Sequence, residues 1–398
     1  MAGAEFFGAQ ERKEVNEVLD TGVLFRYGFD EARKGMFKAR ELEAIAAKFT
    51  GAKHAQAVSS GSTAVTAALV AAGIGLGDEV IVTPFTYVAT VECVLLVGAL
   101  PVFAEIDETL CLSAEGIKAV LTEKTKGIAL VHMCGAAADM DAIMPIVNEH
   151  NLILVEDAGQ ALGAFHKGTS VGLFGKTGCF SFDFFKITTA GEGGLCITND
   201  EAAHNHMSEF SDHGHTHLGN NRGMEEHHII GTNFRLSETN AAIGKVQMQR
   251  IETVIANNKK HKAILKDALA EIDGVTFRHM PDPEGDSATF LNFFMPTTEL
   301  SQKVMAQFAE DGIAGFNYWY TNMYHFINQW NHIKDLKSPN KLGIHHFGAP
   351  QDYNALELPK SNEVVGRLIS LGVKANWPAE DLEAFKIQMV ASIKKVLA

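Results

Sequence analysis

The sequence predicts an α/β protein: a large domain with a mostly parallel sheet between helices, followed by a smaller α+β domain at the C-terminus. Strand-like apolar segments alternate regularly with helical patterns through the first half of the chain. Those segments are apolar at nearly every residue, which is typical of strands covered by helices on both faces. The chain has 398 residues, more than one compact domain usually holds.

Two amphipathic helices are expected before the sheet begins, over residues 9–20 and 38–49. Gly51 ends the second of them. The segment between the helices, residues 24–29, is irregular and contains Arg26. The positions of the first helix that should face the core are Val15, Val18 and Leu19.

Strands and helices of the large domain should then follow in alternation, as in a chain of β-α-β units. The expected strands are residues 54–58, 78–87 (ending in a turn), 101–106, 127–132, 152–155, 178–182 and 194–198. The expected helices are residues 64–72, 88–96, 114–121, 139–150 and, beginning near the N-cap-like Ser237, 232–250.

The loop after the first strand, SSGST at residues 59–63, contains small hydroxylated residues and leads directly into a helix. Free backbone N–H groups, the positive end of the helix dipole and the hydroxyls can together bind an anion such as phosphate. An ordinary N-cap is the alternative interpretation, because serine and threonine are favoured at that position in any helix.

The stretch from residue 152 to 198 contains the most informative pattern. Its first strand ends in an acid, Asp157, and open α/β sheets place functional groups at such strand ends. Lys186 follows among phenylalanines, and burial there would lower its pKa and make the neutral, nucleophilic amine accessible. Pyridoxal phosphate chemistry needs a Schiff-base lysine and an acid at the pyridine nitrogen. The alternative is an acid that caps a helix and a surface lysine near the turn at residues 191–194.

Residues 210–231 are polar and rich in glycine, and they contain His213, His215, His217, His227 and His228. Histidine clusters can bind zinc, so a metal-dependent hydrolase is one alternative function. However, the spacing lacks the HExxH pattern of a helical zinc site. We expect a loop that faces the substrate and no metal, because long loops with little regular structure are usually functional.

We place the domain boundary at residue 250, which gives a large cofactor-binding domain over 1–250 and a small domain over 251–398. The small domain should contain a long helix (251–271), strands (275–278 and 288–295), a helix (300–311), an aromatic-rich loop (316–330), a short helix within 358–369 and a closing helix (379–396).

Composition excludes several classes of function. The net charge of −14 and the lack of a basic run argue against nucleic-acid binding. Polar residues interrupt every long apolar stretch, so we expect no transmembrane span, and the N-terminal residues lack the pattern of a secretory signal. A cytoplasmic protein is therefore expected, with its cysteines reduced and buried. These are Cys93, Cys111, Cys134, Cys179 and Cys196.

Taken together, five segments resemble the DegT/DnrJ/EryC1/StrS family of sugar aminotransferases. They are EDAGQALG (156–163), SFDFFK with GEGG (181–194), SSGST (59–63), PFTYVAT (84–90) and GTNFRLSETNAAIG (231–244). The resemblance covers nearly the whole chain. It implies the fold-type-I architecture, pyridoxal 5'-phosphate as cofactor, and a homodimer whose subunits share each active site.

The resemblance also implies roles for single residues. Lys186 would form the Schiff base, Asp157 would hold the pyridine nitrogen, and Gln160 would reach the ring hydroxyl. Tyr87 would stack on the ring, and Asn233 would reach the cofactor phosphate of the neighbouring subunit. The residues that would bind the phosphate within one chain are Ser62, Thr63 and Ser181.

This sequence departs from the family at one of these positions. Gly61-Ser62-Thr63 stands where the family usually shows Gly-Thr-Ala, but Ser62 keeps the hydroxyl. Related dehydratases of the family have histidine in place of the lysine, so Lys186 favours amino transfer.

Four further segments resemble the members of the family that aminate Kdo, an eight-carbon acid sugar of lipopolysaccharide. They are HMCGAAADMD (132–141), SDHGHTHLGNNRG (211–223), PDPEGDSA (281–288) and YWYTNMYHF (318–326). The resemblance implies amino transfer from glutamate to the C8 aldehyde of Kdo, which gives 8-amino-3,8-dideoxy-manno-octulosonate. Both substrates bring a carboxylate, for which the candidate partners are Arg26, Arg235, His213 and His215.

Alternatives remain open at this point. For each arginine, a structural ion pair is the alternative to a substrate contact. A nucleotide-sugar 3- or 4-aminotransferase would use the same catalytic residues. A regulatory protein that binds the cofactor without turnover is a third possibility.

Overall fold

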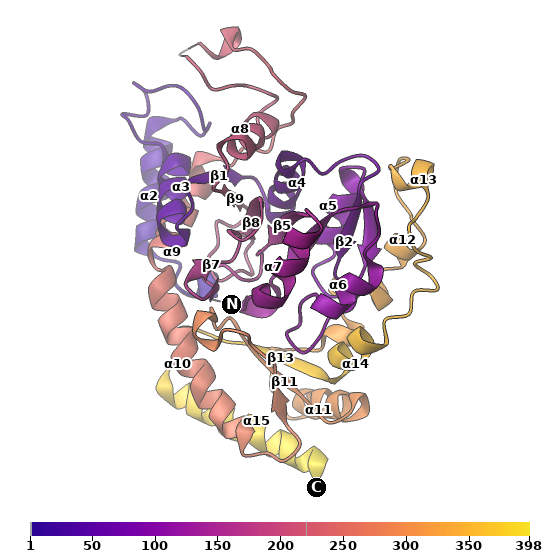
Figure 1. Ribbon diagram of the computed structural model, residues 1–398. Coiled ribbons are helices and arrows are strands. Elements are labelled where there is room, and N and C mark those ends of the chain that lie inside the picture. Colours follow the sequence, from indigo (N-terminus) through magenta and orange to yellow (C-terminus); the bar gives the residue numbers. More distant parts are fainter. Residues whose placement is uncertain (1, 220) are drawn as a thin grey trace.

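The computed structural model describes residues 2–219 and 221–398, which form a large sheet with its helices and a separate, smaller sheet (Figure 1). The strands of the large sheet, in spatial order, are β1 (His54–Val58), β9 (Gly194–Thr198), β8 (Thr177–Ser181), β5 (Ile153–Asp157), β4 (Thr125–Val131), β2 (Glu79–Val82) and β3 (Leu100–Phe103).

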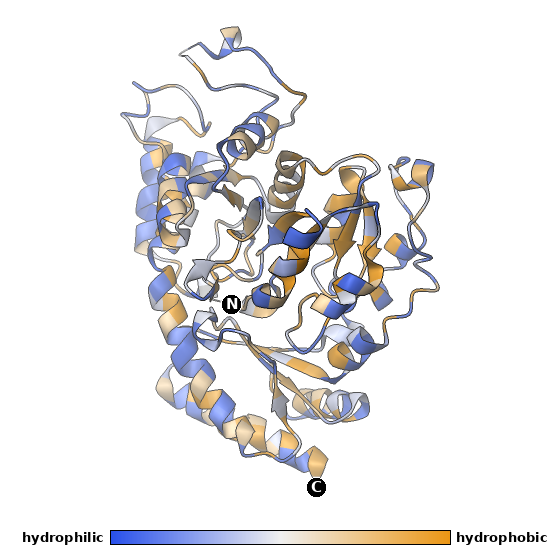
Figure 2. Cartoon of the chain, viewed as in Figure 1, coloured by the Kyte–Doolittle hydropathy of each residue, from blue (hydrophilic) through white to orange (hydrophobic). Residues whose placement is uncertain are grey.

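All neighbouring strands from β8 to β3 are parallel, whereas β9 is antiparallel to both β1 and β8. The prediction of a mostly parallel sheet is therefore confirmed. The strands are apolar because they are buried on both faces, and β3 and β8 are buried at every position. Figure 2 shows the same contrast between the hydrophobic strands around β2 and the hydrophilic outer helix α2 (Ala9–Thr21).

The helices of the large sheet follow its strands along the chain. They are α4 (Gly61–Ala72), α5 (Ala89–Leu96), α6 (Ala114–Val120), α7 (Met140–Glu149) and α8 (Glu201–Phe210). Two further helices, α3 (Lys38–Thr50) and α9 (Glu238–Gln249), pack on each other, and α2 packs on α9. Short pieces complete this part: α1 (Ala2–Glu5), β6 (Phe165–His166) and β7 (Thr169–Ser170).

The smaller sheet is antiparallel, with the strand order β10 (Thr276–Phe277), β11 (Phe290–Phe294), β13 (Leu368–Gly372) and β12 (Phe316–Asn317). Its helices are α10 (Ile251–Ala270), α11 (Thr298–Glu310), α14 (Pro359–Arg367) and α15 (Ala379–Leu397). Between β12 and α14 lie two single-turn helices, α12 (Asn331–Lys334) and α13 (Ile344–Phe347).

The small sheet has its own hydrophobic core, built from residues such as Phe293 and Ile369. In contrast, Trp319, Phe326 and Trp330 belong to the core of the large sheet, so the chain between β12 and α14 packs back onto the large domain. The division into two domains at residue 250 therefore stays a prediction.

Several local predictions differ from the structure. Leu19 is 53% exposed, and the buried positions of α2 are Glu11 and Val18, because Glu11 binds Arg250 and Gln247 across the helix interface. Within the segment 78–87, predicted as a strand that ends in a turn, the strand covers only Glu79–Val82. Helix α8 and strands β12 and β13 were not predicted, and β13 follows α14 without a loop, so no turn residue marks its start.

The five cysteines are free and buried, as predicted. No helix in the described part of the chain has the length and apolar character needed to cross a bilayer.

Candidate active site

A pocket of about 900 Å³ lies where the C-terminal ends of β5 and β8 face the chain that follows β12. This volume suits a cofactor together with a small substrate. Of the eight predicted cofactor residues, the six that line the pocket are Ser62, Tyr87, Asp157, Gln160, Ser181 and Lys186. Thr63 and Asn233 do not line it within one chain.

Asp157 is the last residue of β5, and its carboxylate is held in place from two sides. The Thr90 hydroxyl, at the start of α5, donates to Oδ2 at 2.7 Å, and the Gly159 N–H donates to Oδ1 at 3.0 Å. A Cβ atom at Gly159 would lie 3.0 Å from Oδ1, so the glycine allows this approach. The orientation by Thr90 was not predicted, although Thr90 closes the PFTYVAT segment.

Lys186 lies in the loop after β8 and is partly buried in the pocket. Burial lowers the pKa of its amine below the ordinary value, and the charges of Asp157 and Asp183 act in the opposite direction. The predicted lowering of the pKa is therefore confirmed. The predicted environment is wrong in part, because Phe184 and Phe185 are 54% and 63% exposed.

The N-terminus of α4 faces the same pocket. Ser60 is its N-cap: the Ser60 Oγ accepts from the Thr63 N–H, and the Thr63 hydroxyl accepts from the Ser60 N–H at 2.9 Å. This capping box already engages the Thr63 hydroxyl, and the phosphate contact of Thr63 stays a prediction. The backbone N–H groups of Gly61 and Ser62, at the first two helical positions, are left for an anion.

Gly61 brings the helix end close to the sheet. A Cβ atom there would lie 2.8 Å from both Cβ and Oγ of Ser181, the last residue of β8. The hydroxyls of Ser62 and Ser181 and two free N–H groups therefore line one end of the pocket, as a phosphate group requires.

Gln160 provides the clearest sign of a missing partner. Its side-chain oxygen Oε1 is buried, yet it accepts no hydrogen bond from any described residue. A buried acceptor without a donor costs about 1–3 kcal/mol. Because Gln160 lines the pocket, a ligand with a hydroxyl group at this position would satisfy the oxygen. The residues present therefore fit a phosphorylated pyridine with a ring hydroxyl.

The opposite wall of the pocket comes from the end of β12 and the segment after it, which includes residues 318–326; that segment was noted in the sequence, but none of its residues was assigned a role. Its lining residues include Asn317, Trp319, Asn322, Tyr324 and His325. Backbone N–H groups of Thr86 and Val88 donate to the carbonyls of His325 and Tyr324, at 3.0 and 2.8 Å. These bonds fix the segment beside Tyr87, whose ring lies 5.5 Å from that of His325.

His325 is a neutral group in this wall. Burial, and then the charge of Lys186, lowers its pKa to about 3. Its Nδ1 lies 2.9 Å from the Asn322 side-chain oxygen, and its ring lies 4.5 Å from that of Trp319. His325 can therefore exchange hydrogen bonds with a substrate at physiological pH without carrying charge.

The predicted substrate residues do not line the pocket of their own chain. Arg26 is buried and donates to Glu43 at 2.5 Å and to the Ala57 carbonyl at 3.1 Å. Arg235 forms an ion pair with Asp212. Both contacts match the alternative of a structural ion pair.

The histidines and Asn233 belong to a segment that projects from the body beyond α8 (Figure 1). Nδ1 of His215 lies 3.2 Å from Glu225, and Asn233 accepts from the Arg235 backbone at 3.3 Å. Across the described residues, no three histidine, cysteine or acidic side chains gather as metal ligands would. The hydrolase alternative thus has no geometric support.

Comparison with known proteins agrees with this pocket. The profile of the DegT/DnrJ/EryC1/StrS aminotransferase family matches residues 7–385. The GDP-perosamine synthase of Vibrio cholerae is 34% identical over 77% of this chain and 78% of its own. The L-glutamine:2-deoxy-scyllo-inosose aminotransferase of Streptomyces lividus is 31% identical over 92% of this chain and 88% of its own.

Among solved structures, an aminotransferase from Psychrobacter cryohalolentis superposes with a TM-score of 0.83 at 28% identity, over 98% of this chain and 97% of that one. A 3-amino-5-hydroxybenzoic acid synthase superposes with a TM-score of 0.81 at 27% identity, over the same shares. The chain belongs to the DegT/DnrJ/EryC1/StrS aminotransferase family and is a pyridoxal-phosphate-dependent sugar aminotransferase.

Proposed function

We propose that this enzyme moves the amino group of glutamate to a sugar carbonyl, with Lys186 as the residue that attaches the cofactor and Asp157 at its ring nitrogen. The observation that carries the proposal is the shared pocket: Lys186, the oriented carboxylate of Asp157 and the unpaired oxygen of Gln160 all line it. Ser62 and Ser181 bind the phosphate, and Tyr87 covers the ring.

The bound cofactor supplies an electron sink for the pair of electrons left when the substrate Cα loses its proton. The residues of the chain do the rest. The carboxylate of Asp157 keeps the ring nitrogen protonated, and its position is fixed by Thr90 and Gly159. The neutral amine of Lys186 would take the proton from the substrate Cα and deliver it to the cofactor's aldehyde-derived carbon, C4′, first as base and then as acid.

For the sugar, we propose the C8 aldehyde of Kdo. Of the four segments that resemble Kdo-aminating enzymes, residues 318–326 supply a wall of the pocket. Besides Lys186, Lys374 is the only lysine or arginine among the described residues that line the pocket. Lys374 is exposed, so it can receive the carboxylate of glutamate or of an acid sugar at low desolvation cost.

A nucleotide-linked sugar is the second candidate substrate. It is favoured by the similarity to GDP-perosamine synthase, whose name specifies a GDP-linked sugar. The two candidates differ in charge, because Kdo brings a carboxylate and the nucleotide sugar a diphosphate.

We further propose a homodimer, with the projecting segment of one subunit, residues 211–233, reaching the pocket of the other. Leu218, Met224 and Ile230 in this segment are 74%, 80% and 96% exposed, which is unfavourable for a segment that stays in water. A dimer of this kind would bring Asn233, His213 and His215 to a pocket. The cytoplasm remains the expected compartment.

Replacement of the lysine tests the chemical assignment. Lys186→Ala is expected to abolish the absorbance of the attached cofactor and to reduce turnover with glutamate by at least about 10³-fold, because both attachment and proton transfer are lost. The exposed Lys176 provides the matched control, Lys176→Ala, which should keep both. Retention of the attached-cofactor spectrum by Lys186→Ala would refute the assignment.

Half-reactions then separate the sugars. Enzyme converted by glutamate to its amine-bearing form is mixed with the C8 aldehyde of Kdo or with a GDP-linked 4-keto sugar, and the cofactor spectrum is followed. The sugar that is the true substrate should convert the cofactor back to its aldehyde form within one turnover. A response to the GDP sugar alone would reject the Kdo proposal while leaving the transaminase chemistry intact.

A further inference from the structure

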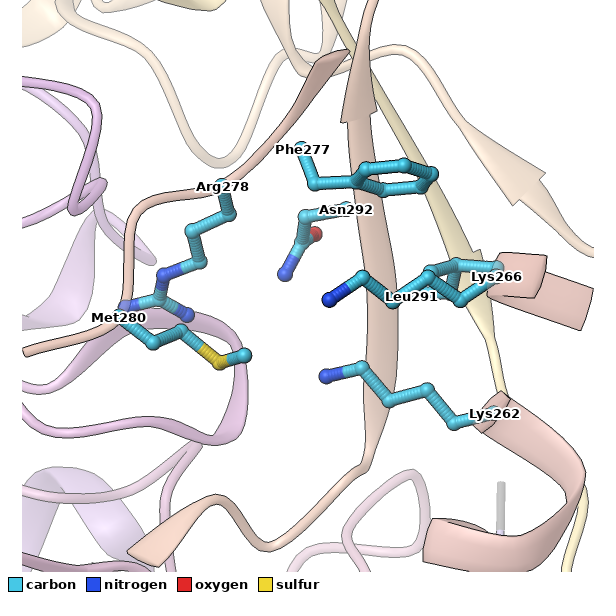
Figure 3. A pocket seen from close by; sticks show the side chains of 7 residues that line it. All are labelled: Lys262, Lys266, Phe277, Arg278, Met280, Leu291 and Asn292. Carbon is cyan, nitrogen blue, oxygen red and sulfur yellow. The ribbon is translucent and has the colours of Figure 1, made fainter. Parts of the chain in front are cut away.

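A second, smaller pocket lies in the small domain and shares no lining residue with the catalytic pocket (Figure 3). Helix α10 contributes two lysines to it, and strands β10 and β11 with their flanking residues contribute the rest. The lining residues are Lys262, Lys266, Phe277, Arg278, Met280, Leu291 and Asn292.

Three cations converge on this pocket in a chain of net charge −14. Lys262 has a carboxylate partner, Asp286, at 2.5 Å. Arg278 and Lys266 form no ion pair with any described residue, although Arg278 is only 6% exposed. The Lys266 ammonium instead lies 5.2 Å from the centre of the Phe277 ring. Arg278 is therefore a buried cation without a carboxylate partner, which is costly, whereas Lys262 is paired and Lys266 is half-buried.

Buried hydrogen-bond donors in the same pocket also lack partners. Asn292 is 3% exposed; its Oδ1 accepts from the Ser370 hydroxyl at 2.6 Å, but no described residue accepts from its Nδ2. Nε of Arg278 is likewise unpaired, while Nη1 and Nη2 donate to backbone carbonyls such as that of Met133. A buried donor without an acceptor costs the full free energy of removing that group from water.

Figure 3 shows how these groups lie. The ammonium groups of Lys262 and Lys266 and the amide nitrogen of Asn292 point into one space, and the Arg278 guanidinium lies across from them. The polar lining groups are cations or donors apart from the Asn292 Oδ1, which accepts from Ser370, and the carboxylate of Asp286 lies beside Lys262; the other lining side chains are apolar.

We propose that this pocket is a binding site for a phosphate group, held by Lys262, Lys266 and Asn292 and by the positive charge of Arg278. A phosphate oxyanion offers several acceptor oxygens and compensates the excess charge with short, charge-assisted hydrogen bonds. The enclosed space of the pocket is about 10 Å³, room for about one water, so a phosphate group fits only when the half-buried side chain of Lys266 moves toward solvent.

The site would connect two parts of the molecule. Arg278 donates to the carbonyls of Met133 and Ala136, in the loop after β4, so a phosphate near it would strengthen the contact between the two sheets. From Asn292, two hydrogen bonds lead through Ser370 to the indole N–H of Trp319 in the catalytic pocket, at 2.6 and 2.7 Å.

Binding can be measured on the holoenzyme, in which bound cofactor already fills the phosphate site of the catalytic pocket. Inorganic phosphate is titrated at constant ionic strength, balanced with chloride, and the melting temperature and binding heat are recorded. We expect a saturable rise in melting temperature. Glycerol phosphate in a second titration distinguishes a free ion from the terminal group of a larger ligand, and binding of either one supports the site.

Matched variants locate the binding. Lys266→Met removes one charge without breaking an ion pair and should weaken phosphate binding about tenfold. Lys260→Met, at an exposed position of the same helix, should bind as the unmodified enzyme does. Asn292→Asp keeps the acceptor for Ser370 but adds a negative charge, and should abolish binding.

Two results would overturn the proposal: no saturable response of the holoenzyme to either phosphate compound, or a Lys266→Met variant that binds as tightly as the Lys260→Met control. A tungstate soak of holoenzyme crystals gives a check that needs no variant, with a heavy-atom peak expected between the two lysines. None of these readouts depends on transamination.

Discussion

Burial of Lys186 makes its amine more reactive and lowers the stability of the cofactor-free protein. Its amine loses hydration in the pocket, and the nearby carboxylates of Asp157 and Asp183 restore only part of the lost free energy, so its pKa falls. In the folded, cofactor-free protein, the Lys186 amine therefore becomes neutral at a lower pH than in the unfolded chain. Such a site is expected to be destabilising until the cofactor occupies it.

Lys186→Met is accordingly expected to stabilise the cofactor-free protein by about 1 kcal/mol at neutral pH. The unfolded state binds more protons than the folded state between the two pKa values, so the stability of the unmodified protein rises with pH in that window. The advantage of the variant should therefore shrink as the pH rises toward the unfolded lysine value of about 10.4.

Denaturant unfolding of the cofactor-free proteins at several pH values measures this difference. Lys176→Met, at an exposed lysine, should leave stability unchanged within about 0.5 kcal/mol at every pH. An advantage of Lys186→Met that grew with pH would show that burial does not govern the titration of this amine.

At the scale of elements, the close approach of α4 to the end of β8 builds the phosphate end of the pocket. Gly61→Ala would place a methyl group 2.8 Å from Ser181 and force the helix and strand apart. We expect the dissociation constant of pyridoxal phosphate to rise at least about tenfold, with about 1–3 kcal/mol lost from stability. Equilibrium dialysis of the cofactor and thermal unfolding give the two numbers.

Gly75→Ala is the matched control, because a Cβ there meets no atom within 4 Å and the position follows the same helix. It should leave cofactor affinity unchanged. If both alanine variants bound the cofactor equally well, the helix end would not determine phosphate binding.

The elements also show what the sequence could predict. Strands β1 and β9 have the predicted bounds, because apolar runs between turn residues mark buried strands well. The two-residue strand β12 and the strand β13, which directly continues α14, have no such boundaries. Lys186 and Asp157 were found because their spacing and chemistry are local in the sequence.

The rest of the site depends on contacts between distant parts of the chain. Thr90 reaches Asp157 across 67 positions, and His325 reaches Tyr87 through backbone pairing that no local pattern reveals. Arg26 and Arg235 appeared to be available for a substrate, since Glu43 and Asp212 become their partners only in the folded chain.

For the whole molecule, the central question is which subunit supplies Asn233. Within one chain, Asn233 lies outside the pocket, at the end of the segment 211–233, where it forms a bridge with Asp212 just after α8. If the partner's Asn233 completes each pocket, every active site takes Lys186 from one subunit and Asn233 from the other. The Lys186→Ala and Asn233→Ala variants then remove residues that different subunits supply to a site. Each variant alone should then have little activity, because every site contains one defect.

Mixed dimers separate the two arrangements. Random reassociation of the two variants gives hybrid dimers in which one site has both defects and the other has none, so about a quarter of all sites should be intact. Recovery of about a quarter of the unmodified turnover is therefore expected after mixing, measured against each variant reassociated with itself. If Asn233 served its own subunit, every site in the mixture would keep one defect and no activity would return.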